Sequence, residues 1–458
     1  MKKTIKITGI ILSLLIVLSC ISVSFVSAAG ESFTFNTSLG YAILTRCQTT
    51  ATGKVEIPST YNGKTVQEIG SSAFANCGGI TEIVIPSSVN KVGNGAFESC
   101  LSLEKITFEG TECKIGKYAF IHCSALETIV LPSSLTEIPD EAFNDCTSLA
   151  SITIPSTVTL IGKEAFKMCN ELTQINIPAS VKTIRKNAFI GCASVKAFNV
   201  DNANTVYSDI NGVLYGPYES SFDPNAVSAD TDKALIQYPN GASATSFSVP
   251  SDVKIISDYA FGENSKLSGV TLPDGLKKID AYAFYMCSKL SDITIPSTVT
   301  TIGSQAFAKC PLLKKITIPA SVADYESAFY DSGLTEVTLE DGVKKISTRA
   351  FEKCSALETV TIPESVEKIE SGAFLNCTLL GETEIPSSVT SIGTKAFDGC
   401  SSLSIIAEEG SAAYDFAVNN GIEVSEKGGE EEPSFFQKII NAIVGFFEMI
   451  IELITSIF

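Results

Sequence analysis

The chain has no tryptophan and a single histidine, His122. A Ser-His-Asp triad needs a histidine beside its nucleophile, whereas His122 directly precedes Cys123, and neighbours in a tight turn do not form a Cys-His pair. Zinc sites that use several histidines are excluded as well. No P-loop or G-x-G-x-x-G motif follows a predicted strand. We therefore expect no enzymatic activity, no metal and no cofactor.

Positive charge is also scarce. Lysine and arginine together number 33 against 51 acidic residues, so the formal net charge is −18. Such a surface repels phosphate backbones and anionic lipid, which argues against nucleic acid as a partner. The same acidity keeps a long protein soluble, and this is the simpler reason for it.

What the chain has in abundance is one repeated unit. Residues 154–176 read IPSTVTLIGKEAFKMCNELTQIN, and variants of these 23 residues occur thirteen times. Every copy contains Ala-Phe, and in eleven copies a cysteine follows three residues after the phenylalanine. A fixed period of this length with an L-x-x-I-x-I segment is the signature of a leucine-rich-repeat solenoid, in which each unit stacks on its neighbours.

Within one repeat, Leu149, Ile152 and Ile154 alternate inward, which is typical of a strand. A second short extended segment follows, and Ala165 and Phe166 begin a tight helical turn. The predicted fold is therefore an all-β repeat protein. It is a leucine-rich-repeat solenoid with a parallel sheet and short helical turns, and a C-terminal amphipathic helix is added to it.

The regular cysteines allow three interpretations. In an exported protein they suggest disulfides. Stacked cysteines in equivalent positions, however, hold their Cβ atoms farther apart than a bridge prefers, so we favour free thiols buried in the core. Metal binding by the row of cysteines is the third and weakest alternative.

The sequence outside the repeats predicts export. Three lysines precede an apolar run, and Val26-Ser27-Ala28 fits signal-peptide cleavage after Ala28. Lipoprotein processing at Cys20 is the less favoured alternative. The predicted segments are a signal peptide (1–28), an N-terminal cap (29–56), repeats 1–6 (57–200), a β-hairpin insertion (201–248), repeats 7–13 (249–406), a C-terminal cap (407–424), an acidic linker (425–433) and an amphipathic apolar helix (434–458).

In 434–458 the polar residues recur every three or four positions and so share one side of a helix. Glu448 and Glu452 would be costly inside a bilayer, so an interfacial or self-associating helix is favoured over a spanning one. This helix would offer a membrane surface or an assembly partner the side chains of Phe435, Phe436, Ile439, Ile440, Phe446, Phe447, Ile450, Ile451, Leu453 and Ile454.

Tyrosines indicate where a partner would bind, because interface hot spots favour them. Nine of the thirteen tyrosines lie between positions 207 and 330. Tyr207, Tyr215 and Tyr238 could pack a small core of the insertion, which we expect to form an arm on the solenoid. We predict that the exposed partner-binding residues are Tyr218, Tyr259, Tyr282 and Tyr285.

The unit I-P-S-S-V-x-x-I-G-x-x-A-F-x-x-C-x-x-L-x-x-I-x resembles the BspA-like leucine-rich repeats of bacterial surface proteins. The best copies are 154–176, 295–317 and 362–384, and the resemblance covers about 57–406. It implies a secreted or cell-surface, non-enzymatic protein that binds a protein or cell-surface ligand, such as host matrix or other bacteria, as an adhesin does. A structural scaffold or spacer without a specific ligand is the alternative.

Overall fold

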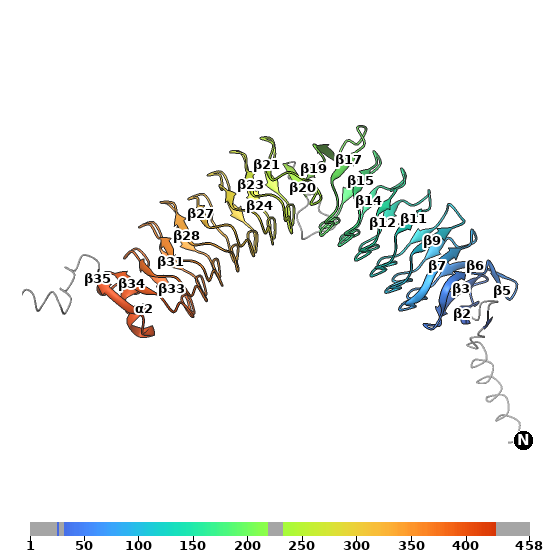
Figure 1. The fold of residues 1–458 in the computed structure, drawn as a ribbon, viewed down its shortest axis with the longest axis horizontal. Coiled ribbons are helices and arrows are strands. Elements are labelled where there is room, and N and C mark those ends of the chain that lie inside the picture. Colours follow the sequence, from blue (N-terminus) through green and yellow to red (C-terminus); the bar gives the residue numbers. More distant parts are fainter. Residues whose placement is uncertain (1–24, 27–31, 219–231, 427–458) are drawn as a thin grey trace, which may run out of the picture.

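The computed structural model of the chain describes residues 25–26, 32–218 and 232–426. These residues form an arched solenoid of short parallel strands with very little helix (Figure 1). The predicted leucine-rich-repeat solenoid is therefore confirmed. The register follows the repeat, since Ile129 pairs with Ile152 and Ile152 lies one unit of 23 residues further along.

One set of strands comes from the L-x-x-I-x-I segments, where branched residues alternate inward and outward, and is extended at its ends by β4 and β35 of the terminal units. Figure 1 labels many of them along the arch. They are β4 (Thr52–Glu56), β7 (Gly79–Ile85), β9 (Lys105–Phe108), β11 (Thr128–Ile129), β13 (Ser151–Ile152), β15 (Gln174–Ile177), β17 (Ala197–Val200), β21 (Ser246–Ser248), β23 (Gly269–Thr271), β25 (Asp292–Ile293), β27 (Lys315–Ile318), β28 (Glu336–Leu339), β30 (Thr359–Thr361), β32 (Glu382–Glu384), β34 (Ser404–Ala407) and β35 (Glu423–Glu426).

The second set, apart from β3 and β20, precedes the Ala-Phe turns, and most of its strands have two residues. Its members are β3 (Ala42–Cys47), β6 (Lys64–Ile69), β8 (Lys91–Val92), β10 (Lys114–Ile115), β12 (Glu137–Ile138), β14 (Leu160–Ile161), β16 (Thr183–Ile184), β20 (Lys233–Gln237), β22 (Ile255–Ile256), β24 (Lys278–Ile279), β26 (Thr301–Ile302), β29 (Lys345–Ile346), β31 (Lys368–Ile369) and β33 (Ser391–Ile392).

The Ala-Phe turn consists of successive β-turns. Ala165 N donates to Gly162 O, and Cys169 N donates to Phe166 O, at 3.3 and 3.2 Å. Glu164 and Met168, the third residues of these two turns, have φ values of 54° and 60°. Third residues with positive φ characterise type II turns. Neighbouring turns are joined by a ladder of backbone hydrogen bonds, such as Phe166 N to Ala188 O at 2.8 Å.

Phenylalanines fill the interior of these turns. Phe166 is fully buried and stacks on Phe143 and Phe189, with ring centroids 5.5 and 5.8 Å apart. The repeated cysteines lie beside them as free thiols, and Cys169 Sγ donates to Phe143 O at 3.2 Å. A cysteine at this position therefore links two adjacent repeats through a hydrogen bond.

The two ends of the solenoid are covered by irregular units. At the N-terminal end β2 (Ser32–Asn36) pairs with β3 and with β1 (Phe25–Val26), while β5 (Thr60–Tyr61) pairs with β6. At the C-terminal end, α2 (Ala412–Asn420) begins at Ser411, whose side chain accepts from Tyr414 N, and ends at Gly421 in the left-handed region. These units cover apolar side chains that the terminal repeats would otherwise expose.

The prediction that the insertion forms an arm on the solenoid is wrong, because the insertion is part of the solenoid itself. β18 (Ser208–Ile210) and β19 (Val213–Pro217) form the hairpin, β19 pairs with β20, and β20 pairs in parallel with β22 of the next repeat. The buried side chains form two large clusters. Leu214 belongs to the first, and its neighbours Val213 and Tyr215 belong to the second, because successive side chains of a strand face opposite sides.

Candidate functional site

Three tyrosines form a partly exposed aromatic cluster, the tyrosine cluster, on the Ala-Phe turns of repeats 7 and 8. Tyr259 and Tyr282 precede the Ala-Phe pair at positive φ, 52° and 57°, and their rings stack at 4.6 Å with an interplanar angle of 5°. The ring of Tyr285 meets both edge-on, at 6.1 and 5.5 Å. Three of the four tyrosines predicted to bind a partner therefore lie together on one surface.

Charged side chains lie near the tyrosine cluster. Lys309 Nζ lies 5.9 Å from the centroid of the Tyr285 ring. Burial, together with the neighbouring Tyr282 and Tyr285 and the carboxylates of Glu263 and Glu164, raises the pKa of Tyr259 to about 12. The Tyr259 hydroxyl therefore stays protonated at neutral pH and can donate to a partner.

The expected exposure of Tyr218 is wrong. Tyr218 is only 9% exposed and packs with Ala234 and Ile255. Its hydroxyl accepts a hydrogen bond of 2.6 Å from Lys278 Nζ, which also lies 4.7 Å from the ring centroid. The tyrosine is buried because β19 runs beside β20, which places Tyr218 over the second set of strands.

Tyr207, Tyr215 and Tyr238 do not form a separate core of the insertion. Tyr207 is buried in the first cluster, and its hydroxyl accepts from Ile184 N at 2.7 Å. Tyr215 and Tyr238 are buried in the second cluster. These three residues therefore join the insertion to the repeats on either side.

The sequence reasoning missed a cleft where repeat 6 meets repeat 7, here called the junction cleft. The turn of repeat 6 forms one wall, with Arg185, Lys186 and Asn187, and Ser257 and Asp258 of repeat 7 form the other. Its floor consists of Pro217, Tyr218, Ile236 and Gln237. The cleft holds about 50 Å³ of space that a water-sized molecule could occupy.

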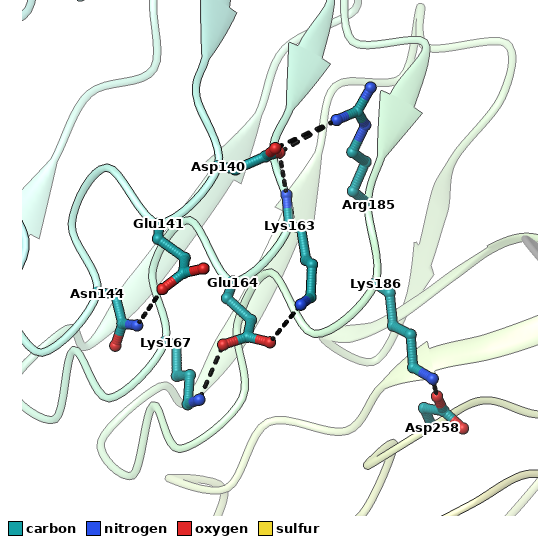
Figure 2. Close-up of polar contacts among 9 residues, drawn as sticks. All are labelled: Asp140, Glu141, Asn144, Lys163, Glu164, Lys167, Arg185, Lys186 and Asp258. Atoms are coloured by element: carbon teal, nitrogen blue, oxygen red, sulfur yellow. Dashed lines mark hydrogen bonds and ion pairs between the residues drawn. The ribbon is translucent and has the colours of Figure 1, made fainter. Parts of the chain in front are cut away.

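Two side chains of one cleft wall, Arg185 and Lys186, form ion pairs (Figure 2). Arg185 and Lys186 extend in opposite directions, Arg185 to Asp140 at 3.2 Å and Lys186 to Asp258. Burial by itself would raise the pKa of Asp140, but hydrogen bonds from Lys117 and Lys163 N and the charges of Lys117 and Arg185 hold that pKa below its usual value. Arg185 is thus engaged with a carboxylate outside the cleft.

A family model described as the BspA type leucine rich repeat region matches residues 67–196, 238–327 and 324–411. These matches cover well over half of the chain. The chain belongs to the BspA-type leucine-rich-repeat family. No curated protein matches it.

Several solved structures share the fold of this BspA-type protein. A leucine rich cell surface protein from Faecalibacterium prausnitzii is 29% identical, with a TM-score of 0.56 over 86% of this chain and 97% of that one. The pneumococcal vaccine antigen PcpA is 22% identical, with a TM-score of 0.62 over 89% and 99%. A leucine-rich repeat protein from Eubacterium ventriosum is 24% identical, with a TM-score of 0.56 over 83% and 95%.

The BspA-type solenoid is typically non-enzymatic. His122 is exposed and its Nδ1 lies 3.0 Å from Asp145 Oδ2, so it faces an acid and no nucleophile. Burial raises the pKa of Cys192 to about 12, which keeps this thiol protonated and unreactive at neutral pH. Within residues 25–26, 32–218 and 232–426, no group of three or more His, Cys, Asp and Glu side chains is placed to hold a metal ion.

Two predictions concern segments that lie wholly or almost wholly outside the described part of this BspA-type chain. They are the apolar helix over 434–458, and the signal peptide over 1–28 with its lipoprotein alternative at Cys20, of which the structure describes only Phe25–Val26. Among the residues that the structure does describe, none belongs to a helix long and apolar enough to cross a membrane.

Proposed function

We propose that this protein is exported and binds a protein or cell-surface ligand, such as host matrix or other bacteria, without catalysing a reaction. The observation that carries the proposal is the tyrosine cluster, Tyr259, Tyr282 and Tyr285, a preformed group of partly exposed aromatic rings. Family membership supports it, since leucine-rich-repeat proteins generally bind proteins.

The tyrosine cluster has the physical properties of an interface hot spot. Its rings are partly exposed and pack against one another, so little side-chain entropy remains to be lost on binding. Each ring offers a large apolar area and a hydroxyl that can donate a hydrogen bond. Exposed Met286, on the same turn as Tyr285, extends the apolar surface.

The test is a triple variant, Tyr259→Ser, Tyr282→Ser and Tyr285→Ser, assayed for binding to mucus, immobilised matrix and whole bacteria. We expect at least tenfold weaker binding and a thermal midpoint close to that of the unchanged chain. Tyr118→Ser is the matched control, because Tyr118 also precedes an Ala-Phe pair, has a φ of 61° and is 39% exposed.

Full binding by the folded triple variant would show that the partner uses another surface. The threonines on the L-x-x-I-x-I strands are the next candidate, and Thr294→Lys with Thr317→Lys tests them. Absence of binding to all three materials by the unchanged chain would instead favour a structural spacer.

A further inference from the structure

The junction cleft exists because one layer of the solenoid is too short. A layer here means one coil of the chain, and the short one is the coil that contains β20. Leu235 O accepts from Ser257 N in the same way that Ile256 O accepts from Asp280 N, so Leu235 and Ile256 are equivalent. Tyr238 N donates to Ala260 O as Phe261 N donates to Ala283 O, so Tyr238 occupies the phenylalanine position. Two residues separate Leu235 from Tyr238, whereas four separate Ile256 from Phe261.

The two missing residues interrupt the ladder between turns. In intact layers the residue before Ala-Phe donates to the next turn, as Glu164 N does to Lys186 O at 3.2 Å and Tyr259 N to Ala281 O at 3.3 Å. Asn187 N and Phe189 N hold the corresponding places in repeat 6, and neither has a backbone acceptor among the described residues. Across the cleft, Asp258 O accepts from no backbone N–H of those residues.

Side-chain groups on both walls are unpaired as well. Asn187 Oδ1 and Ser257 Oγ are both buried and have no hydrogen-bond partner among the described residues. Buried polar groups normally have partners, because a buried group that lacks one has lost its hydrogen bonds to water without replacement. Backbone donors on one wall and a backbone acceptor on the other, with one layer missing between them, match the chemistry of a polypeptide backbone, which joins exposed strand edges through the same groups.

The Lys186–Asp258 ion pair lies at the junction cleft. The Lys186 side chain, which crosses to Asp258, is 36% exposed and is long enough to swing into solvent. Asp258 immediately precedes Tyr259 of the tyrosine cluster, so a partner bound to that cluster would lie beside the cleft. Once separated, Lys186 and Asp258 could each pair with a charged side chain of the incoming segment.

We propose that the junction cleft binds an extended segment of a partner polypeptide, whose backbone takes the place of the missing turn. A carbonyl of that segment accepts from Asn187 N, and one of its N–H groups donates to Asp258 O. The remaining polar groups of the segment meet Asn187 Oδ1 and Ser257 Oγ.

The probe is a library of random linear heptapeptides displayed on phage and selected on the full chain. The decisive variant replaces Ile236 and Gln237 by Ser-Asp-Tyr-Ala, the turn of 257–260, and so fills the cleft with the chain's own backbone. We expect selected peptides to bind this filled variant at least tenfold more weakly. They should also slow hydrogen exchange in residues 184–192 of the unchanged chain.

Ser257→Leu tests the same point with a single substitution, should the filled variant fail to fold. Its control is Ser304→Leu, which places the same side chain on an exposed position of an intact layer. Peptides that bind the filled variant and the unchanged chain equally, or a selection without enriched peptides, would overturn the proposal. It is equally overturned if peptides bind only after 219–231 is replaced by a short Gly-Ser linker, because the site would then serve the chain's own segment.

Discussion

Phe166→Ala tests how the solenoid is held together. Phe166 has no exposed surface and stacks between Phe143 and Phe189, so its removal leaves a cavity between two rings that the neighbouring backbone ladders hold apart. Phe→Ala changes in cores cost about 3–5 kcal/mol, and the rigid ladders on both sides place this one at the upper end. The free energy of unfolding should fall by about that amount in urea, followed by circular dichroism.

The location of the loss is equally informative. Phe166 belongs to the first buried cluster, and Phe284 occupies the equivalent position in the second. Hydrogen exchange should accelerate mainly in 33–214 for Phe166→Ala and mainly in 213–417 for Phe284→Ala, because a repeat contacts only its neighbours. A loss below about 1 kcal/mol, or equal acceleration in both parts, would contradict the reasoning.

Three further predictions follow from the turns, the thiols and the C-terminal tail. Gln305→Gly, at a φ of 56°, should leave stability unchanged or raise it by up to about 1 kcal/mol, and Gln305→Val should lower it, both measured by urea denaturation. Burial raises the pKa of Cys192 from 9.0 to about 12, and an unfolded thiol ionises first. The stability that this thiol contributes is therefore complete below pH 9 and decreases between about pH 9 and 12. In that range the urea midpoint of Cys192→Ala should depend less on pH than that of the unchanged chain. A chain ending at Glu432 should lose membrane or assembly association, and unchanged fractionation and sedimentation would count against a role for 434–458.

The repeat itself made most of the fold predictable. The L-x-x-I-x-I alternation placed the strands, and the Ala-Phe pair placed the turn whose phenylalanine fills the core. Within 407–424, the segment predicted as the C-terminal cap, the structure forms the helix α2 at Ala412–Asn420. These features are local, because each depends on side chains within one repeat and on its immediate neighbours.

The structure of the insertion was harder to predict, because it depends on pairing between segments that are distant in the sequence. Asn211-Gly212 predicts a hairpin but does not say what the hairpin packs against. In the structure the β19 strand alternates between two cores, and its continuation buries Tyr218 under Lys278. Tyrosine composition alone could not separate Tyr218 from Tyr259, since both were expected to be exposed.

The junction cleft, by contrast, can be recognised in the sequence once the layers are aligned, because one layer has fewer residues between its strand and its aromatic residue. Ala234-Leu235-Ile236-Gln237-Tyr238 corresponds to Ile255-Ile256 and the turn that ends at Phe261, with two residues fewer. A repeat that keeps its strand and its aromatic residue but loses part of its turn retains its core and its ladder to β22. It must then leave the backbone of the preceding turn without a neighbour. The same deletion therefore preserves the solenoid and leaves Asn187 and Asp258 on opposite sides of an unfilled layer.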